Sequence, residues 1–583
     1  MNTDNQNVFK TQAGDQITPF SLVVSAATMM RLAALFVLIV HFGATFTFAR
    51  PDQPPIVQTG LGSIRGTILE SRLGRKFYAF RGIRYANAPV GKLRFQPPEP
   101  VDAWNGTFDA TEDGPMCPQP AYNRSEVSED CLRLNVYSSV IPGETIRIAP
   151  RDVLVYIHPG GFYVFSGQSK NNAGPQNLMD RDVVLVTINY RLGSLGFMST
   201  GTKESPGNAG FKDQVMALKW VRDHISAFGG RPDSVTLMGY SAGALSNTLH
   251  MVSPMSRGLF HRVIVMSASG VSQVQIPTNQ INLAKKQAEL LNCSTSDVSK
   301  MVGCLREKPV SDYADSLEAM FVLSWNPVLL WTAVIEPDFG QERFLTEDPT
   351  ESFLKGNFMK VPVIAGITQD EFAGPAVAFL RNETLRNELN TNFNELAPML
   401  FLYEGYPNQL EITRQLRDKF LGEEPLSLNR SLHGLNYLFA DSLIGFAVHR
   451  FVQLVSPHTP VYQYKFSYVG RYSFFYYPEE GTPYGAVHHD DLLYLLSIPS
   501  VAPIFNTTDP ESKTVERLTR MWTAFAQTGD PNMVLGIEKP NWVPVANQED
   551  NYLNIGEDLQ MEKGLFTERF SFWDKLFPIP AIH

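Results

Sequence analysis

Cysteine is scarce in this chain. Only 4 of its 583 residues are cysteine, and they form two local pairs, Cys117 with Cys131 and Cys293 with Cys304. Three connectivities are possible, of which pairing within each local pair is the simplest because it closes small surface loops. Cysteines committed to bridges leave none for a metal cluster, and the chain has no phosphate-cradling glycine loop. We therefore expect neither a metal nor another cofactor.

Basic residues do not outnumber acidic ones. The chain has 49 Lys and Arg against 59 Asp and Glu, and the net charge of -10 is spread along its length. This balance argues against nucleic acids and anionic membrane surfaces as partners. No Pro/Ser/Gly-rich linker, charge block or internal repeat interrupts residues 50–583, and 44% hydrophobic residues suffice for a large core. We predict one domain over residues 50–583, and the sequence leaves its oligomeric state open.

The amino terminus has the pattern of a targeting segment. Arg31 precedes the apolar stretch Leu32–Val40, and Thr47-Phe48-Ala49 offers the small residues that a signal peptidase reads. We predict that residues 1–49 are a signal peptide or N-terminal targeting segment, with cleavage after Ala49. The polar stretch before Arg31 is long for a signal peptide, and a start of translation at Met29 or Met30 would make the segment compact.

An uncleaved signal anchor is the alternative, because Leu32–Ala49 contains only His41 as an ionisable group and is just long enough to span a bilayer. The carboxyl terminus carries neither a retention tetrapeptide nor a hydrophobic anchor tail. We expect a secreted protein, with attachment through an N-terminal anchor as the alternative. Six N-glycosylation sequons fit passage through a glycosylating compartment, at Asn105, Asn123, Asn292, Asn382, Asn429 and Asn506.

Apolar runs and helical periodicity alternate along the chain as in an α/β protein. Residues 56–69, broken by Gly60 and Gly62, predict an opening β-hairpin. The segment Ala209–Phe228 has apolar residues at helical spacing and precedes the apolar run Val235–Met238. We expect a mostly parallel sheet with helices on both faces and long loop and helical insertions. Further strands are predicted at residues 152–157, 182–188, 263–266, 361–365 and 460–466.

The most informative motif is Gly239-Tyr240-Ser241-Ala242-Gly243. It follows the expected strand Val235–Met238 and precedes a helix-like segment, so it is typical of a nucleophile elbow, in which a tight turn lifts a serine hydroxyl to the rim of the sheet. Small neighbours allow the strained backbone, and the helix N-terminus behind Ser241 favours developing negative charge. Because such a short pattern also arises by chance, its meaning rests on partners elsewhere in the chain.

A second motif, His158-Pro159-Gly160-Gly161-Phe162, follows the strand predicted at 152–157. Its paired glycines can present backbone N–H groups inward because no side chains obstruct them. We predict that the N–H groups of Gly160, Gly161 and Ala242 form an oxyanion hole for a tetrahedral intermediate. A Pro-Gly-Gly run taken alone is more often a surface turn, but its place after a buried strand and upstream of an elbow favours the catalytic interpretation.

A serine nucleophile also needs a base and an acid. Among 11 histidines, His488 and His489 lie in a glycine-led loop after the strand at 460–466, where loop residues can reach the top of the sheet. Asp370 and Glu371 follow the strand at 361–365. The order serine, acid, histidine is the one found in α/β-hydrolases. The spacing alone does not decide which member of either pair serves.

With these motifs the chain resembles the type-B carboxylesterases of the cholinesterase-like superfamily, from roughly Pro54 to Phe577. The resemblance implies an α/β-hydrolase fold and a triad of Ser241, Glu371 and His488. It also implies the pairings Cys117–Cys131 and Cys293–Cys304, and it places the hydroxyl of Ser267 near the acid. Besides the elbow, it is carried by Phe80–Ala86 with Arg94-Phe95, Glu129–Val136, Asn208–Gln214, Trp220-Val221 and Phe228–Gly230.

Departures from the family pattern bear on the substrate. Pro159 stands where relatives commonly have glycine, at a position that is not an oxyanion donor. The loop between Cys117 and Cys131 contains no Trp, so the aromatic cation site of choline recognition is missing and cholinesterase activity is not expected. Tyr240 replaces the Glu, Gln or His that more often precedes the serine, and we expect its phenol to border the site. This replacement also weakens a juvenile-hormone-esterase-like interpretation, although Phe80–Arg84 resembles insect members of the family.

We therefore predict a secreted serine carboxylesterase that hydrolyses small hydrophobic esters through an acyl-enzyme. The alternative is a catalytically weak or inactive cholinesterase-like adhesion or binding protein, because this fold also serves as a recognition domain. A third interpretation is an esterase that sequesters hydrophobic esters and turns over slowly. The physiological ester and its acyl and alcohol preference are left open.

Overall fold

The structure is a computed structural model that describes residues 54–120, 124–142, 149–475, 483–533, 541–546 and 549–579. These residues all belong to one unit, Pro54–His583. The predicted targeting segment at residues 1–49 and the sequon at Asn123 lie outside the described residues.

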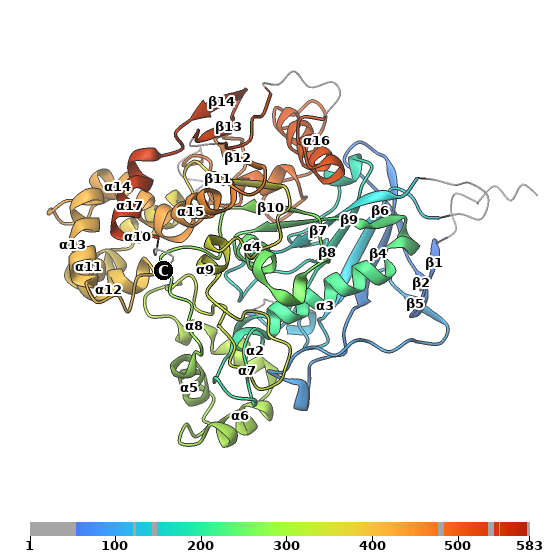
Figure 1. Cartoon of the computed structure of the whole chain (residues 1–583), viewed down its shortest axis with the longest axis horizontal. Coiled ribbons are helices and arrows are strands. Elements are labelled where there is room, and N and C mark those ends of the chain that lie inside the picture. Colours follow the sequence, from blue (N-terminus) through green and yellow to red (C-terminus); the bar gives the residue numbers. More distant parts are fainter. Residues whose placement is uncertain are drawn as a thin grey trace, which may run out of the picture. The chain divides into compact units, whose positions relative to one another are not determined.

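An 11-stranded mixed sheet organises this unit (Figure 1). Seven adjacent strands, from β13 through to β8, run parallel, and antiparallel strands complete the sheet at both edges. The prediction of a mostly parallel sheet is confirmed. Across the sheet the order is β14 (Leu559–Lys563), β13 (Asn551–Ile555), β12 (Val461–Phe466), β11 (Val363–Thr368), β10 (Arg262–Met266), β9 (Gly230–Tyr240), β7 (Arg151–Ile157), β8 (Val184–Ile188), β6 (Arg133–Ser138), β4 (Lys76–Arg84) and β3 (Thr67–Glu70).

The amino-terminal strands divide between two sheets. β1 (Ile56–Thr59) and β2 (Gly62–Arg65) form the predicted hairpin, and with β5 (Thr107–Asp109) they make a separate three-stranded sheet. The last residues of the predicted hairpin segment instead belong to β3 in the large sheet. At Gly62 a Cβ atom would lie 2.8 Å from the backbone oxygen of Trp104, so only glycine fits this close approach.

Helices cover both faces of the large sheet, and side-chain alternation along β7 shows how. Val153 and Val155 pack into the core shared with α3 and α4, whereas Leu154 and Tyr156 pack into the core shared with α16. Such alternation follows from the period of two along a strand, and continuous apolar runs such as 152–157 arise because both faces are buried. The helices are α3 (Ala209–His224), α4 (Ala242–Val252) and α16 (Ser512–Thr528), each visible against the strands in Figure 1.

Local boundaries differ slightly from the predicted ones for simple reasons. The predicted helix Ala209–Phe228 is α3 followed by a 3-10 turn, Ile225–Phe228. The strand predicted at 361–365 is β11, which begins at Val363 because Pro362 has no N–H to donate to the sheet. The apolar run Val235–Met238 is the second half of β9, which ends at the elbow.

Long helical insertions separate the last strands of the parallel core. One helical segment, Leu428–Val455, is long and apolar enough to cross a membrane, but 89% of its most apolar window is buried inside the protein, as expected for a core helix. A π-helical turn, Asp441–Gly445, interrupts it between α14 and α15. The remaining insertion helices are α5 (Ile281–Leu290), α6 (Val298–Arg306), α7 (Val310–Asp315), α8 (Leu317–Met320), α9 (Pro349–Leu354), α10 (Ala373–Arg381), α11 (Glu383–Thr391), α12 (Phe393–Leu400), α13 (Gln409–Phe420), α14 (Leu428–Ala440) and α15 (Phe446–Val455). Two further helices are α2 (Gly193–Phe197) and α17 (Thr567–Leu576).

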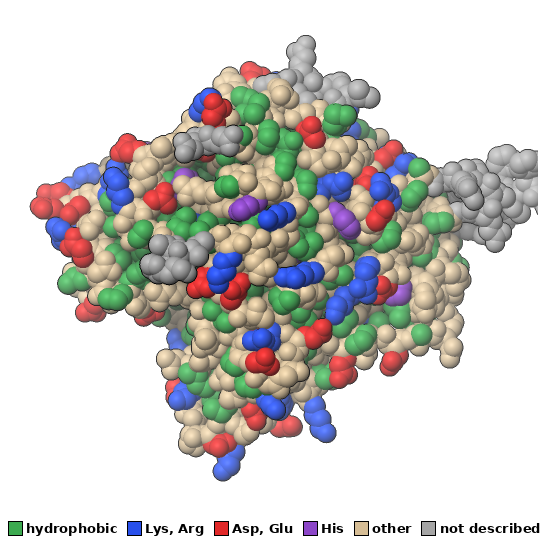
Figure 2. All heavy atoms as spheres, in the orientation of Figure 1, with side chains coloured by type: hydrophobic (Ala, Val, Ile, Leu, Met, Phe, Trp, Pro, Cys, Tyr) green, Lys and Arg blue, Asp and Glu red, His purple; other side chains and the backbone are tan. Residues whose placement is uncertain are grey.

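The surface is mixed in charge, and the cysteines are paired. On the face shown in Figure 2, acidic and basic side chains are interspersed rather than gathered by sign. Disulfides join Cys117 to Cys131 and Cys293 to Cys304, so each closes a short segment of chain. The described sequon asparagines are all exposed, at Asn105, Asn292, Asn382, Asn429 and Asn506.

Candidate active site

Ser241 sits at a strained turn between β9 and α4. Its φ of 53° and ψ of -118° lie outside the regions that most non-glycine residues adopt. The turn closes only because Gly239 and Gly243, two residues before and two residues after Ser241, have no side chain. A Cβ at Gly239 would lie 2.2 Å from the Gly243 oxygen, and a Cβ at Gly243 would lie 2.0 Å from the Ile157 oxygen. The elbow sequence therefore folds into the turn that exposes the hydroxyl at the end of a buried strand.

The Pro-Gly-Gly loop lies beside this turn. Gly160 has a φ of 107° and Gly161 a φ of 57°, conformations in which a Cβ would meet the Val164 oxygen or the Tyr163 ring. Among the described residues, the N–H groups of Gly160 and Gly161 have no hydrogen-bond acceptor. Both residues line the same cavity as Ser241 and Ala242. Ala242 is the first residue of α4, where backbone N–H groups have no partner within the helix.

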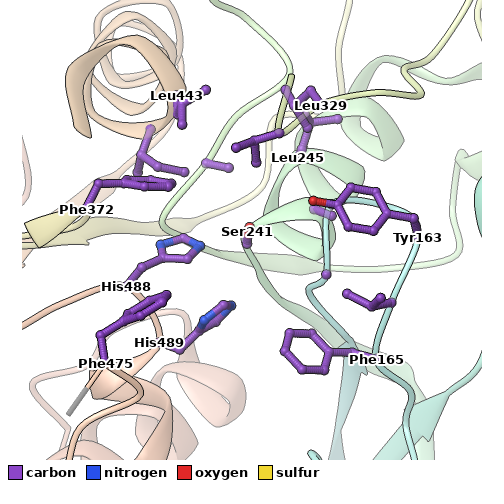
Figure 3. Close-up of a pocket in the computed structure, with 17 residues that line it drawn as sticks. Tyr163, Phe165, Ser241, Leu245, Leu329, Phe372, Leu443, Phe475, His488 and His489 are labelled. Atoms are coloured by element: carbon purple, nitrogen blue, oxygen red, sulfur yellow. The ribbon is translucent and has the colours of Figure 1, made fainter. Parts of the chain in front are cut away.

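The acid and the histidine meet across two loops. Nδ1 of His488 lies 2.6 Å from Oε2 of Glu371. The other carboxylate oxygen of Glu371 accepts a hydrogen bond from the Ser267 hydroxyl at 2.6 Å and one from the Thr368 N–H at 2.8 Å. Figure 3 shows the imidazole of His488 directed toward Ser241. The residues of the predicted triad are thus brought together at the carboxyl ends of β9 and β11 and in the loop after β12.

Burial controls the protonation of this pair. Glu371 is fully enclosed, and desolvation raises the pKa of its carboxyl to about 7. Desolvation also lowers the pKa of His488 to about 3. The resting imidazole is therefore neutral and, with Nδ1–H directed at Glu371, it carries an unprotonated Nε2. That nitrogen is the atom that can accept a proton from a serine hydroxyl.

The other members of the two candidate pairs have different positions. Asp370 is partly exposed, and its carboxylate accepts a hydrogen bond from the side chain of Gln369. His489 is buried with a φ of 80°, and its backbone N–H donates to the Tyr240 hydroxyl at 2.8 Å. Neighbouring residues of a loop point in different directions, which explains why the spacing left both pairs open.

Tyr240 does not border the cavity as its position before the serine suggested. Its side chain is fully buried and is absent from the residues that line the cavity. The ring instead packs beneath the two histidines, with its centroid 5.2 Å from that of His488 and 4.9 Å from that of His489. Tyr240 is therefore behind the candidate site rather than in the path of a ligand.

The cavity beside Ser241 has a volume of about 200 Å³ and mostly apolar walls. Figure 3 shows that side chains from several elements surround Ser241, and that the phenol oxygen of Tyr163 points into the cavity. Phe372 stacks on the His488 ring, with centroids 5.4 Å apart. A second apolar cavity of about 300 Å³ shares Val328, Phe372 and Phe475 with the first. The first cavity is also lined by Tyr163, Val164, Phe165, Leu245, Ala268, Leu329, Leu443, Ile444 and His489.

Sequence reasoning missed two buried acids that follow the histidine pair. Asp490 is buried, and its carboxylate accepts from the Val487 N–H at 3.0 Å and the Ser473 hydroxyl at 2.9 Å. Asp491 is completely buried and accepts from the Tyr464 hydroxyl at 2.9 Å. Two consecutive acids after two histidines were the available signal, because carboxylates are rarely buried without a structural or functional partner. In the described part of the chain, no cluster of three or more His, Cys, Asp or Glu side chains is arranged to hold a metal ion.

Known proteins match this chain over most of its length. Residues 53–573 match the protein family described as "Carboxylesterase family". The chain is 36% identical to a juvenile hormone esterase of Tribolium castaneum over 555 residues, which covers 89% of this chain and 93% of that protein. It is 33% identical to venom carboxylesterase-6 of Apis mellifera, covering 89% of this chain and 94% of that protein.

A solved structure extends the similarity to the fold. The crystal structure of juvenile hormone esterase from Manduca sexta, with OTFP covalently attached, aligns with a TM-score of 0.79 and 28% identity. The alignment covers 90% of this chain and 100% of that one. The likeness in fold therefore extends over most of the chain.

Proposed function

Because the chain belongs to the carboxylesterase family, we propose that it is a secreted serine esterase in which Ser241, His488 and Glu371 form the catalytic triad. The observation that carries the proposal is the 2.6 Å contact between His488 and Glu371 beside the strained Ser241 elbow. A neutral imidazole, a buried carboxylate and a serine hydroxyl that lines the cavity are the three groups that acyl transfer to serine requires.

The reaction proceeds in two acyl-transfer steps. Nε2 of His488 takes the proton of Ser241 as its oxygen attacks the ester carbonyl, and Glu371 stabilises the imidazolium that forms. The N–H groups of Gly160, Gly161 and Ala242 receive the negative charge that develops on the carbonyl oxygen. His488 then protonates the leaving alcohol. In the second step His488 takes a proton from water as the water oxygen attacks the acyl-enzyme. The acid is released, and His488 returns the proton to Ser241.

The substrate is a hydrophobic ester with no formal charge near the carbonyl. The walls of both cavities are mainly aliphatic and aromatic, and the second cavity extends the first past Phe372 and Phe475. Each buried methylene of a substrate is worth about 0.8 kcal/mol. An acyl or alcohol group that reaches the second cavity therefore gains affinity over a short one.

Juvenile hormone is a second candidate substrate. Two relatives named juvenile hormone esterase align over most of the chain. The replacement of Gln by Tyr240 argued against this activity only if the side chain touched the ligand, and Tyr240 does not line the cavity. The candidate is tested by comparing kcat/KM for juvenile hormone with kcat/KM for simple esters of similar length. A ratio below one-hundredth would remove juvenile hormone from consideration.

We further propose that residues 50–583 are the mature hydrolase domain, exported after removal of residues 1–49. A secreted carboxylesterase among the relatives, the venom enzyme of Apis mellifera, and the exposed sequons support export. Expression in insect cells, followed by N-terminal sequencing of protein from the medium, tests the cleavage site. Retention of the chain in the membrane fraction would favour the uncleaved anchor.

The catalytic proposal is tested by active-site titration with an organophosphate and by ester turnover. Wild-type protein should lose activity after one equivalent is bound, and Ser241→Ala should neither react nor hydrolyse above background. Ser246→Ala is a matched control, because Ser246 is buried in the same helix, bonds the Ala242 oxygen and does not line the cavity. If the wild type hydrolyses a panel of esters no faster than Ser241→Ala, the protein is a binding or adhesion protein and not an esterase. Covalent labelling with slow turnover would instead favour sequestration.

A further inference from the structure

The histidine loop is tied through its backbone to both of its proposed catalytic partners. The N–H of His488 donates to the backbone oxygen of Glu371 at 2.9 Å. The next N–H, that of His489, donates to the hydroxyl of Tyr240 at 2.8 Å. The first bond holds the base to the acid, and the second holds it to the strand end that carries the nucleophile.

This second bond restrains a backbone that would otherwise relax. His489 adopts a φ of 80°, which a residue with a Cβ rarely takes unless its surroundings impose it. On the far side of the loop, Asp490 accepts from the Val487 N–H, so the loop is also fixed by its own side chain. The Tyr240 hydroxyl is the one contact in this set that comes from the nucleophile's own strand.

Tyr240 is itself rigidly held. It is the last residue of β9, it pairs in register with Met266 of β10, and its side chain is fully buried. Its ring lies against both imidazoles, so the phenol contacts the histidine loop through its face as well as its oxygen. A hydrogen bond to such a rigidly held group fixes the distance between the histidine loop and the end of β9, because neither the strand nor the ring can follow a displaced loop.

We propose that the Tyr240 hydroxyl is a positioning group for the catalytic base, which fixes the His488 imidazole relative to Ser241 by accepting the hydrogen bond of the His489 N–H. The proposal rests on the triad assigned under the proposed function. It replaces a role in substrate selection, suggested by the place of Tyr240 in the sequence, with a role in aligning the triad. A displacement of about 1 Å between reacting groups can cost on the order of 100-fold in rate.

A different role for the same hydroxyl is an effect of charge. Asp491 is completely buried near Glu371, and the hydroxyls of Tyr240 and Tyr464 both interact with its carboxylate. Removing either hydroxyl would change the charge environment of the acid. Only Tyr240, however, accepts from the histidine loop, whereas Tyr464 donates to Asp491 from β12. Tyr464→Phe is therefore the matched control, since both phenols are fully buried and both interact with Asp491.

The test compares Tyr240→Phe, Tyr464→Phe and Ser241→Ala with wild type in the full chain. The kcat values of wild type and the two tyrosine variants are normalised to sites titrated by an organophosphate, and the rate of Ser241→Ala is normalised to protein concentration. Tyr240→Phe keeps the ring and removes only the acceptor. We expect kcat to fall about 10- to 100-fold with KM within twofold, at every pH on the profile, and Tyr464→Phe to stay within threefold of wild type. Hydrogen exchange of a peptide spanning residues 483–492 should accelerate in Tyr240→Phe and not in Tyr464→Phe.

Each result separates the possibilities. A wild-type kcat in Tyr240→Phe, or equal losses in the two Tyr→Phe variants, would overturn the positioning role. A shifted midpoint of the acidic limb with an unchanged plateau would assign the hydroxyl to charge instead. If wild type and Ser241→Ala hydrolyse equally, the proposed esterase function has failed, independently of Tyr240. Should Tyr240→Phe not fold, hydrogen exchange of the wild type decides: the His489 amide must be strongly protected, as expected for an N–H bonded to a buried hydroxyl, or the proposal is wrong.

Discussion

Replacement of Glu371 by Gln is predicted to place the proton of His488 on the wrong nitrogen. Oε1 of Glu371 accepts from the fixed Thr368 N–H at 2.8 Å and from the Ser267 hydroxyl at 2.6 Å. A glutamine satisfies the Thr368 donor only with its amide oxygen at this position. Its NH2 group then faces Nδ1 of His488, which must accept instead of donating. The remaining imidazole proton moves to Nε2, where it points at Ser241 and prevents general-base catalysis.

The size of the loss follows from the cost of the opposite amide orientation. Turning the amide would return an acceptor to His488 but would set the NH2 group against the Thr368 N–H, leaving a buried donor unpaired at a cost of about 1–3 kcal/mol. The productive orientation is then a minor population, and a neutral amide also stabilises the imidazolium less than a carboxylate does. We expect kcat/KM to fall at least 10²-fold, approaching the ~10⁴-fold, or about 5.4 kcal/mol, of a fully misdirected tautomer.

The assay is steady-state hydrolysis of 4-nitrophenyl butyrate by Glu371→Gln, Ser267→Ala and wild type, with thermal melting to show that each variant folds. Ser267→Ala retains the carboxylate together with its bonds to Thr368 and His488, so its loss should stay below about tenfold. A folded Glu371→Gln protein that keeps more than a tenth of wild-type kcat/KM would refute the assignment of Glu371 as the orienting acid.

Three further outcomes are expected. Burial lowers the pKa of His488 and raises that of Glu371 to about 7, so as the pH falls the carboxylate that stabilises the imidazolium is lost before the base gains a proton. The acidic limb of kcat/KM should therefore have its midpoint near pH 7, and a midpoint below pH 5 would contradict the raised pKa of Glu371. Gly161→Ala introduces a Cβ that would lie 2.5 Å from the Tyr163 ring at a φ of 57°, so the backbone N–H of residue 161 must move. The single-turnover rate of ester hydrolysis should then drop about 100-fold. An unchanged rate would exclude Gly161 from the oxyanion hole. Val328→Phe narrows the junction of the two cavities and should exclude about two methylenes of a long acyl chain. We expect kcat/KM to fall about 15-fold for an octanoate ester and to stay within twofold for an acetate ester. Equal effects on both esters would show that acyl chains do not pass Val328.

The fold was predictable from the sequence because its signals are local. Continuous apolar runs marked the parallel strands, and the helical spacing of Ala209–Phe228 marked the helix that precedes β9. The elbow and the Pro-Gly-Gly loop were visible because a tight turn after a strand needs glycine at fixed positions, as the close approaches at Gly239 and Gly243 show. These features depend on a few consecutive residues.

The substrate cavity was not predictable because its walls come from segments that are distant in sequence. Val328 and Leu329 belong to an irregular loop, Leu443 and Ile444 to a π-helical turn, and Phe475 to the loop after β12. No periodicity in any one segment reports a contact with another. The choice within each adjacent pair, Asp370 or Glu371 and His488 or His489, was undetermined for the same reason, since loop conformation decides which side chain turns inward.

The placement of Tyr240 shows where local and tertiary information divide. Alternation along β9 puts Tyr240 on the same face as Met238, in the core shared with α16, and puts Leu237 on the opposite face. The cavity residues Phe372 and Leu443 belong to the core on the opposite face. The alternation of side chains along a strand therefore predicts that Tyr240 and Leu237 lie on opposite faces of the sheet. Only the folded chain shows on which of these faces the cavity opens. Once that face is known, a tyrosine before the nucleophile cannot reach a bound ester, and any effect it has on turnover acts through the groups that it contacts, the histidine loop and Asp491.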